Sequence, residues 1–290
     1  MTLDARTLLP IAEHAVTIAS QIVTTRLPGA VTAKGDRDMA TEVDFAVEDA
    51  LRDFLTRETP EIGVLGEEEG LTNQGGNGLT WALDPIDGTV NFMHGLPMCG
   101  TSLGLLDGDV PVLGVIELPF LGERYTAADG TGSRLNGEPI AVAGAERLSS
   151  VVVAIGDYAV GPDAETVNGR RLVLARTLAG KVQRLRMLGS AATALAWIAA
   201  GRIDATVLYT NKPWDTAAGA VIAREAGAAV ADFDGTPHTM RSAATLAANP
   251  AVLAGLLDLA RPVFPPDGQG DGAAPSSPGA PLSPSKPLLS

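Results

Sequence analysis

The stretch LDPIDGTVNF, residues 83–92, follows an apolar run and places two aspartates where that run ends. The apolar run is typical of a buried strand, which would deliver Asp84 at its end. Pro85 fixes the backbone, so Asp84 and Asp87 are held close together with little conformational freedom left to lose. The carbonyl of Ile86 lies in the same turn, and carboxylate and carbonyl oxygens are the ligands that Mg²⁺ prefers.

The two residues that follow the second aspartate suit an anion. Gly88 allows close backbone approach, and the amides of Gly88 and Thr89 can face a phosphate where the chain turns into its next element. An ordinary turn requires one of these features, not all of them together. The stretch therefore predicts a metal–phosphate site.

Two other acidic sites also lie where predicted elements meet. Residues 66–70 read GEEEG and include Glu67, and residues 214–219 read WDTAAG and include Asp215. Each has an ordinary explanation when taken alone. A run of glutamates is usually a solvated loop, and an aspartate at the start of a helix is often a cap.

The charge balance limits the kind of ligand. The chain of 290 residues has 21 Lys and Arg against 34 Asp and Glu, a formal net charge of −13. This surplus argues against a nucleic-acid partner, because nucleic-acid affinity depends mainly on basic residues. An acidic protein that handles phosphate needs positive charge from elsewhere, and a divalent metal ion is the obvious source.

The few cysteines and histidines limit the kind of metal. Cys99 is the single cysteine, which excludes an internal disulfide and a thiolate cluster, and it is expected to be a small buried hydrophobe. The three histidines have no ligand-like spacing, so a hard, oxygen-ligated ion is expected. The uncharged, apolar-looking stretch 187–201 is too short and too interrupted to span a bilayer. We expect a cytoplasmic protein with no membrane partner.

The hydrophobic pattern predicts two halves and a tail. Helices are expected at 8–23 and from Thr41 to 54, followed by strands at 63–65, 79–83, 101–106, 110–118 and 124–127. Strands at 151–155, 182–188, 203–208 and 229–232 then alternate with helices at 169–178, 190–200 and 214–226, and a last helix covers 252–259. We expect an N-terminal α+β half (1–145), a C-terminal α/β half (146–261) and a disordered tail (262–290), in which Pro, Gly and Ser make up 17 of the 29 residues.

Four motifs in the correct order resemble those of the inositol monophosphatase family. Residues 83–92 resemble its D-P-[IL]-D-G-T-x-N-F signature, and Gly66-Glu67-Glu68 resembles its upstream G-E-E motif. Residues 214–219, with Glu225-Ala226-Gly227 after them, are similar to its C-terminal motif. Lys34, Thr41 and Asp44 resemble its N-terminal block. The matches run from about Lys34 to Gly227.

The resemblance implies a lithium-sensitive, Mg²⁺-dependent phosphomonoesterase of α/β class, an αβαβα five-layer sandwich of the sugar-phosphatase type that is usually a homodimer. It implies two or three Mg²⁺ ions, the first held by Glu67, Asp84 and the Ile86 carbonyl, and the second by Asp84, Asp87 and Asp215. Thr89 and Glu67 would orient the attacking water, with Asp44 supporting Thr89; the simpler explanation of Asp44 is that it complements the dipole of its helix. The expected phosphate and substrate contacts are Lys34, Asp87, Gly88, Thr89, Gly189, Ser190 and Ala191, although Ser190 is also a natural N-cap.

The substrate is less determined than the metal site. Animal members carry an inositol-binding glutamate seven residues before the C-terminal metal aspartate, and Leu208 stands at that position here. Inositol monophosphate is the first expectation. Histidinol phosphate, fructose 1,6-bisphosphate and 3′-phosphoadenosine nucleotides are the alternatives within the same chemistry. A regulatory binding protein of this fold is the alternative outside it.

Overall fold

The computed structural model describes residues 4–35, 38–72 and 78–264. The helices are η1 (Ala5–Leu8), α1 (Leu9–Thr25), α2 (Glu42–Glu58), α3 (Thr89–Met93), η2 (Leu148–Ser150), α4 (Ala164–Ala179), α5 (Ala191–Ala199), α6 (Pro213–Glu225) and α7 (Pro250–Ala260). The strands of the first half are β1 (Val31–Gly35), β2 (Asp38–Thr41), β3 (Gly63–Gly66), β4 (Gly70–Thr72), β5 (Leu79–Asp87), β6 (Gly100–Asp107), β7 (Val110–Leu118), β8 (Glu123–Ala128), β9 (Ser133–Leu135) and β10 (Glu138–Ile140). Those of the second half are β11 (Val152–Ile155), β12 (Arg184–Arg186), β13 (Ala205–Leu208), β14 (Ala229–Ala231) and β15 (Thr245–Ala248).

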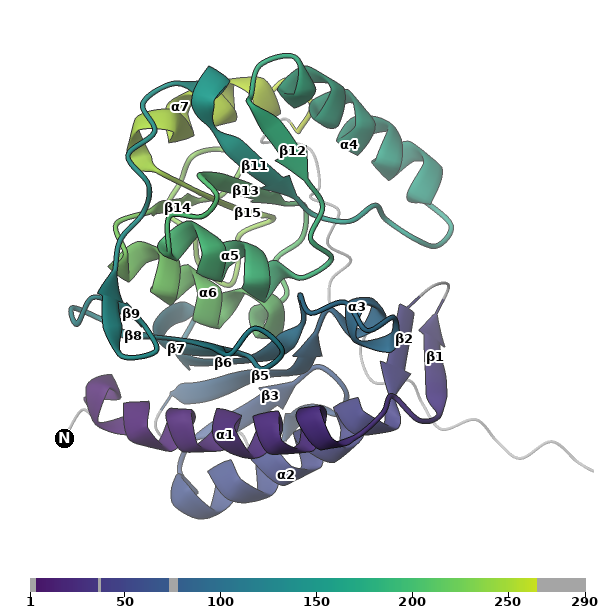
Figure 1. Ribbon diagram of the computed structural model, residues 1–290, viewed down its shortest axis with the longest axis vertical. Helices are drawn as coiled ribbons and strands as arrows, with labels where there is room; N and C mark the ends of the chain where they lie inside the picture. The colour runs from purple at the N-terminus through teal and green to yellow at the C-terminus, as the bar shows by residue number, and fades with distance from the viewer. Residues whose placement is uncertain (1–3, 36–37, 73–77, 265–290) are drawn as a thin grey trace, which may run out of the picture.

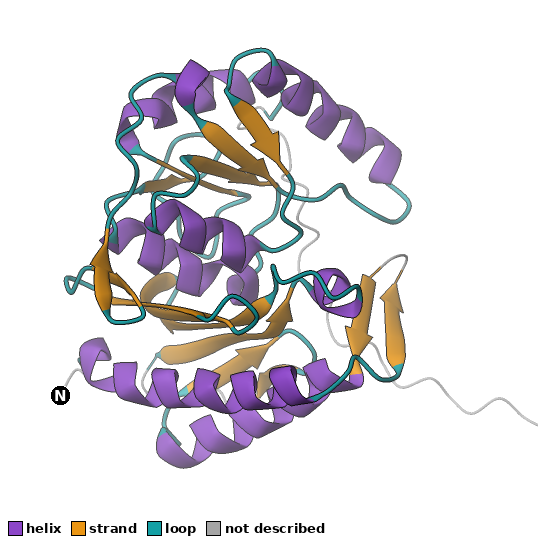
Figure 2. Ribbon diagram, in the orientation of Figure 1, coloured by secondary structure: helices purple, strands orange, loops and turns teal. Residues whose placement is uncertain are grey.

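These elements form five layers (Figure 1). Helices α1 and α2 cover one face of an eight-stranded sheet of order β10-β9-β8-β7-β6-β5-β3-β4. Helices α5 and α6 lie between this sheet and a five-stranded one of order β12-β11-β13-β15-β14, and α4 and α7 cover the far side of the smaller sheet. The predicted αβαβα order is confirmed, and Figure 2 shows the alternation of helix and strand layers.

The amphipathic patterns explain the outer helix layer. The stripe predicted for α1 is buried at Ala12, Ala15, Val16, Ala19 and Val23. Helix α2 begins as predicted, because the Thr41 side chain accepts a hydrogen bond from the Val43 amide while Asp44 accepts one from the Thr41 amide. Both helices therefore start and face the sheet as their sequences dictate.

Small residues allow α6 to lie close to the larger sheet. Gly104 and Gly114 are directly paired across β6 and β7, and both lie under the Ala217–Ala218 segment of α6. A side chain at either glycine would overlap that helix. This close approach brings the first turn of α6 to the edge of the sheet at which β5 ends.

Several elements differ from those predicted. The strand expected at 182–188 is reduced to β12, an edge strand that pairs only with β11 and is largely exposed. Helix α4 begins five residues earlier than expected, at Ala164. The hairpin β1–β2 and the short strands β4, β9, β10 and β15 had no predicted counterpart, because segments of three to five residues carry too little periodicity.

The expected tail, 262–290, lies mostly outside the described residues. Its first residues correct the expectation, because Phe264 is buried and stacks on Phe233 with ring centroids 4.4 Å apart. The strands of the larger sheet lie within 63–140 and those of the smaller within 152–248; the division of the chain at residue 145 stays a prediction. Among the described residues, no helix combines the length and the apolar character that crossing a membrane requires.

Gly114→Ala tests the seat of α6. The added methyl group would overlap the backbone of Ala218, so we expect the free energy of unfolding to fall by about 1–3 kcal/mol in urea titrations. Gly144→Ala is the control, because nothing lies within 4 Å of its added carbon. An equal effect of the two substitutions would contradict the packing described.

Candidate metal-dependent active site

Five acidic residues, one of them Asp157, line one cavity of about 530 Å³, named here the acidic cavity, and the other four come from the three acidic stretches of the sequence. These four are Glu67, Asp84, Asp87 and Asp215. Ile86, Gly88 and Thr89 line it as well. The three acidic sites of the sequence therefore meet in space.

Strand pairing brings the first two acids together. Strands β3 and β5 run parallel, with Gly66 opposite Leu83, so Glu67 and Asp84 follow at the same edge of the sheet. The Glu67 amide donates to the Leu83 carbonyl at 3.1 Å. The ends of two adjacent parallel strands thus fix the spacing of two carboxylates.

An irregularity in β5 turns Asp84 and Asp87 toward the same side. Residues three apart in a regular strand point to opposite faces. Here Asp84 pairs with Ser102 and Asp87 with Gly100, so β5 carries one extra residue relative to β6. Pro85 lies within this bulge, where its missing amide leaves no pairing group unused. The Pro85 ring and the bulge are the local reason that both aspartates reach the cavity.

Asp215 reaches the cavity from the first turn of α6. Ser102, the partner of Asp84 in the sheet, donates a side-chain hydrogen bond to the carbonyl of Trp214 at 2.9 Å. This bond ties the start of α6 to the strand next to Asp84. The helix that separates the two sheets therefore supplies the fourth carboxylate.

Burial and the neighbouring acids raise the pKa of the three aspartates. Burial, followed by the charges of Glu67, Asp87 and Asp215, raises the pKa of Asp84 well above its ordinary value. Burial raises the pKa of Asp215 to about 8 against the attraction of Lys212, and the charges of Glu67 and Asp87 add to the rise. Buried carboxylates that repel one another are costly unless a cation accompanies them.

One oxygen of Asp84 is an acceptor without a donor. Within the described part of the chain, the buried Oδ1 of Asp84 has no hydrogen-bond partner. A buried oxygen of this kind, among other carboxylates and the Ile86 carbonyl, fits a hard divalent cation. Within residues 4–35, 38–72 and 78–264, no three acidic, histidine or cysteine side chains form a ready-made ligand group.

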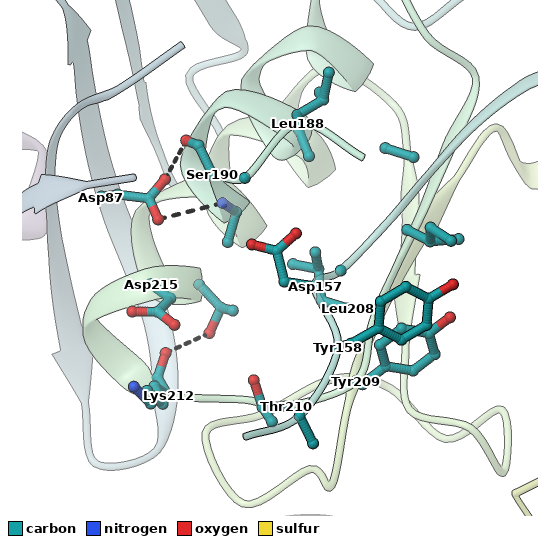
Figure 3. Close-up of a pocket in the computed structure, with 18 of the residues that line it drawn as sticks. Asp87, Asp157, Tyr158, Leu188, Ser190, Leu208, Tyr209, Thr210, Lys212 and Asp215 are labelled. Atoms are coloured by element: carbon teal, nitrogen blue, oxygen red, sulfur yellow. Dashed lines mark hydrogen bonds between the residues drawn. The ribbon is translucent and has the colours of Figure 1, made fainter. Parts of the chain in front are cut away.

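The N-terminus of α5 holds Asp87 in place. The amides of Ala191 and Ala192 donate to the Asp87 carboxylate at 3.2 and 2.7 Å. The Ser190 hydroxyl donates to it as well (Figure 3). Burial raises the pKa of Asp87 to about 6, while these hydrogen bonds oppose the rise. Ser190 is also the N-cap of α5, accepting from the Thr193 amide at 3.1 Å.

Two of the expected substrate contacts at 189–191 thus also have a structural role. Ser190 and Ala191 contact Asp87, and they line a further cavity together with Gly189. Gly189 has φ +69° and lies against the side chain of Asn91, which donates to the Leu188 carbonyl at 2.7 Å. The segment therefore positions Asp87, a metal-ligand candidate, from the N-terminus of α5.

Thr89 and Asp44 are in contact. The Thr89 hydroxyl lies 3.1 Å from Asp44 Oδ1 and 3.1 Å from the Ile86 carbonyl. Asp44 is fully buried, which raises its pKa, and it also completes the cap of α2 through Thr41. The two interpretations of Asp44 are compatible, since one carboxylate oxygen serves each partner.

Lys34 contacts two carboxylates but does not itself line the cavity. Its Nζ lies 2.9 Å from Glu67 and 2.9 Å from Glu68, and it does not line the acidic cavity. Burial lowers the pKa of Lys34, but the two glutamates outweigh burial and raise it. Burial raises the pKa of Glu68 to about 7, against the attraction of Lys34. Lys34 thus lies beside Glu67 and Glu68, outside the cavity lining, where it neutralises part of the acidic charge.

A buried pair on α2 anchors the loop that carries Glu67. Glu48 accepts hydrogen bonds from the amides of Glu68 and Glu69, both at 2.9 Å, and from Arg52 at 2.6 Å. Arg52 also donates to the Gly70 carbonyl at 2.6 Å. This pair has no counterpart among the residues predicted from the sequence; the signal that could have revealed it is an acid and a base four residues apart within an otherwise apolar helix face.

A second cavity of about 490 Å³, named here the side cavity, adjoins the first. The two share Asp87, Asp157, Leu188, Gly189, Lys212 and Asp215. The residues that line only the side cavity include Leu208, Tyr158, Tyr209 and Thr210 (Figure 3).

The single cysteine lies outside both cavities. Cys99 is buried as expected, and burial raises the pKa of its thiol to about 12.

Comparison with known proteins identifies the family. The model of the inositol monophosphatase family matches residues 4–262. The chain belongs to the inositol monophosphatase family. It is therefore a phosphoric monoester hydrolase, and members of this family are generally metal-dependent.

Relatives and solved structures agree with this assignment. Inositol monophosphatase 1 of Solanum lycopersicum is 37% identical over 230 residues, covering 76% of this chain and 81% of the relative. A fructose-1,6-bisphosphatase/inositol-1-monophosphatase of Thermotoga maritima is 36% identical over 203 residues, covering 69% and 74%. The crystal structure of the extragenic suppressor protein suhB of Bartonella henselae matches with a TM-score of 0.82 and 30% identity, covering 88% of this chain and 98% of that one.

Glu48→Gln tests the anchoring of the Glu67 loop. The substitution removes the shorter and buried ion pair of Arg52 and leaves only its 3.6 Å pair with the exposed carboxylate of Glu69, so we expect a loss of stability of up to about 3–5 kcal/mol. We also expect the Mg²⁺ concentration for half-maximal activity to rise by about 10- to 100-fold, because Glu67 loses its support.

The matched control is Glu58→Gln on the same helix, where the ion pair with Arg57 is exposed and contributes little. A Glu48→Gln enzyme with an unchanged Mg²⁺ requirement would show that the pair does not position Glu67.

The raised pKa values predict how the stability of the metal-free protein depends on pH. The pKa of Asp215 is about 8 in the folded state and about 3.8 in the unfolded chain. Folding therefore takes up a proton at pH values between these two. With a chelator present, the free energy of unfolding should therefore fall from pH 6.5 to 8, by at most about 2 kcal/mol per proton. His238, whose pKa burial lowers to about 4, does not interfere in this window.

Thermal unfolding across this range, with Asp215→Asn and the exposed Asp49→Asn as control, is the measurement. The Asp215→Asn variant should show a flatter pH profile than the control. A stability that rises with pH in the wild type would contradict the electrostatic description.

Proposed function

We propose that the protein hydrolyses a small phosphate monoester of a polyol, with inositol monophosphate as the first candidate, and that it uses Mg²⁺. The observation that carries the proposal is the meeting of Glu67, Asp84, Asp87 and Asp215 in one cavity, with a buried Asp84 oxygen that no donor satisfies among the described residues. Hard oxygen ligands of this type suit Mg²⁺. The names of the relatives from Solanum lycopersicum and Thermotoga maritima support inositol monophosphate.

The carboxylates divide into two ligand sets in this proposal. Glu67, Asp84 and the Ile86 carbonyl hold a first ion, and Asp84, Asp87 and Asp215 hold a second, with Asp84 shared between them; a third ion is compatible with the charge present. When bound, these ions supply the positive charge that the phosphate needs and make a nearby water a better nucleophile.

The other residues orient the reactants. Because the Thr89 hydroxyl can give its proton to Asp44, its lone pairs are available to accept a hydrogen bond from the attacking water. Glu67 lines the same cavity and can accept the second hydrogen bond of that water. The amides of Gly88 and Thr89 lie in the loop that faces the phosphate, and Lys34 limits the repulsion between Glu67 and Glu68.

The side cavity favours a single phosphate over a bisphosphate. Arg184 and Arg186, the two cations of β12, line neither cavity. Of the cations that line the side cavity, Lys212 stands over the Trp214 ring, and Arg171 is buried and donates to the Asp157 carbonyl at 2.6 Å. Fructose 1,6-bisphosphate is a second candidate only because the name of the Thermotoga maritima relative includes it.

Three further parts of the proposal rest on family membership. We infer inhibition by Li⁺, a homodimer, and a cytoplasmic enzyme with no nucleic-acid partner. The last agrees with the net charge of −13.

Asp84→Asn tests the metal chemistry. Loss of the shared ligand should reduce Mg²⁺-dependent phosphate release from inositol 1-phosphate by more than about 100-fold, beyond the usual effect of losing an outer-shell partner. Without Mg²⁺ its thermal stability should equal or exceed that of the wild type, because one repelling charge is gone. Asp107→Asn, an exposed position at the end of β6, is the control.

The same assay on histidinol phosphate, fructose 1,6-bisphosphate and a 3′-phosphoadenosine nucleotide, with and without Li⁺, ranks the substrates. A large preference for histidinol phosphate would overturn inositol monophosphate as the first candidate. If no small monoester releases phosphate, the regulatory alternative replaces the proposal.

A further inference from the structure

The loop after β11 presents a carboxylate, Asp157, that the metal chemistry does not use. Asp157 lines both the acidic cavity and the side cavity. Figure 3 shows its carboxylate pointing into the pocket, between Asp87 and Asp215 on one side and the two tyrosines on the other. It is therefore placed where the part of a substrate beyond its phosphate would lie.

The backbone around Asp157 is held by hydrogen bonds to β13 and to Arg171. Strands β11 and β13 run parallel with Ile155 opposite Val207, and the Gly156 amide donates to the Val207 carbonyl at 2.9 Å. Arg171, which is only 5% exposed, donates to the Asp157 carbonyl at 2.6 Å and lies over the Tyr209 ring at 4.6 Å. A buried arginine thus supports the loop through its main chain.

The side chain of Asp157 is available to a ligand. In the part of the chain that the structure describes, its carboxylate makes no hydrogen bond, and the residue is solvent-exposed. The surrounding walls raise its pKa by desolvation, while Arg171 opposes the rise. Leu208, on the next strand, lines the same cavity with an apolar side chain and offers no hydrogen bond.

We propose that Asp157 is a specificity-determining residue that accepts hydrogen bonds from substrate hydroxyl groups in the side cavity. This inference rests on the proposed phosphatase function and names the chemistry of the part of the substrate that leaves as an alcohol. Among the acids that line the side cavity, Asp87 and Asp215 are assigned to the metal ions, so Asp157 supplies the carboxylate for a polyol. Hydrogen bonds of hydroxyls to a charged acceptor are strong enough to select among substrates.

Asp157→Asn separates this role from catalysis and from folding. For inositol 1-phosphate we expect a loss of about 10- to 100-fold in kcat/KM, expressed mainly in KM. For 4-nitrophenyl phosphate, which has no hydroxyl groups, kcat/KM should stay within about twofold of the wild type. Asp157→Glu retains the carboxylate and should recover part of the loss.

The matched control is Asp163→Asn, an exposed aspartate farther along the same loop that lines neither cavity. It should leave both substrates unchanged. Unfolding midpoints establish that the variants fold, and Asp157→Ser is a second variant should Asp157→Asn be unstable.

The outcomes distinguish the two proposals. A wild type that releases phosphate from neither substrate contradicts the proposed function. A wild type active on both, with Asp157→Asn losing both equally or neither, overturns the role of Asp157 alone. Activity on 4-nitrophenyl phosphate but on no polyol phosphate, or a loss confined to the amine-bearing histidinol phosphate, overturns the assignment to hydroxyl groups as well.

Discussion

Repulsion among buried carboxylates is the constraint on which the rest of this structure depends. Asp84, Asp87 and Asp215 lie in one cavity with Glu67, and burial and mutual charge raise the pKa of each of the three aspartates. Such an arrangement lowers the stability of the chain unless a cation joins it. In a protein with a net charge of −13, that cation also supplies attraction for an anionic ester.

The scaffold holds these charges together from three directions. The bulge in β5 aims two aspartates at one side of the sheet, and the parallel pairing with β3 adds the glutamate. The Glu48–Arg52 pair on α2 fixes the loop beyond β3, and the N-terminus of α5 donates two amides to Asp87. The close seat of α6 on Gly104 and Gly114 brings in the fourth carboxylate. Helices and strands therefore hold the carboxylates together against their mutual repulsion.

Most of the layered fold could be predicted from the sequence because long amphipathic helices and strands carry strong periodic signals. Helix α1, the Thr41 cap of α2 and the Asp84 strand are examples. Short elements escaped prediction, since the hairpin β1–β2 and strand β15 are defined by their partners rather than by their own residues. The local composition places Phe264 in the tail, because it does not reveal the contact with the distant Phe233.

The candidate site divides in the same way. The acids and Thr89 could be selected from motifs, because their chemistry is unusual at turns. The contacts that orient them could not, because the Ser190–Asp87 and Thr89–Asp44 bonds join residues 103 and 45 positions apart. Asp157 carries no motif at all, and only the two cavities that it borders draw attention to it.

Crystals grown with Mn²⁺ in place of Mg²⁺ test the central claim most directly, because the anomalous signal of Mn²⁺ locates the ions independently of any assumed ligand. The account predicts at least two anomalous peaks in the acidic cavity, each within about 2.0–2.4 Å of carboxylate oxygens, with Asp84 contacting both. Occupied crystals of an active enzyme without a peak beside Asp84, Asp87 and Asp215 would contradict it.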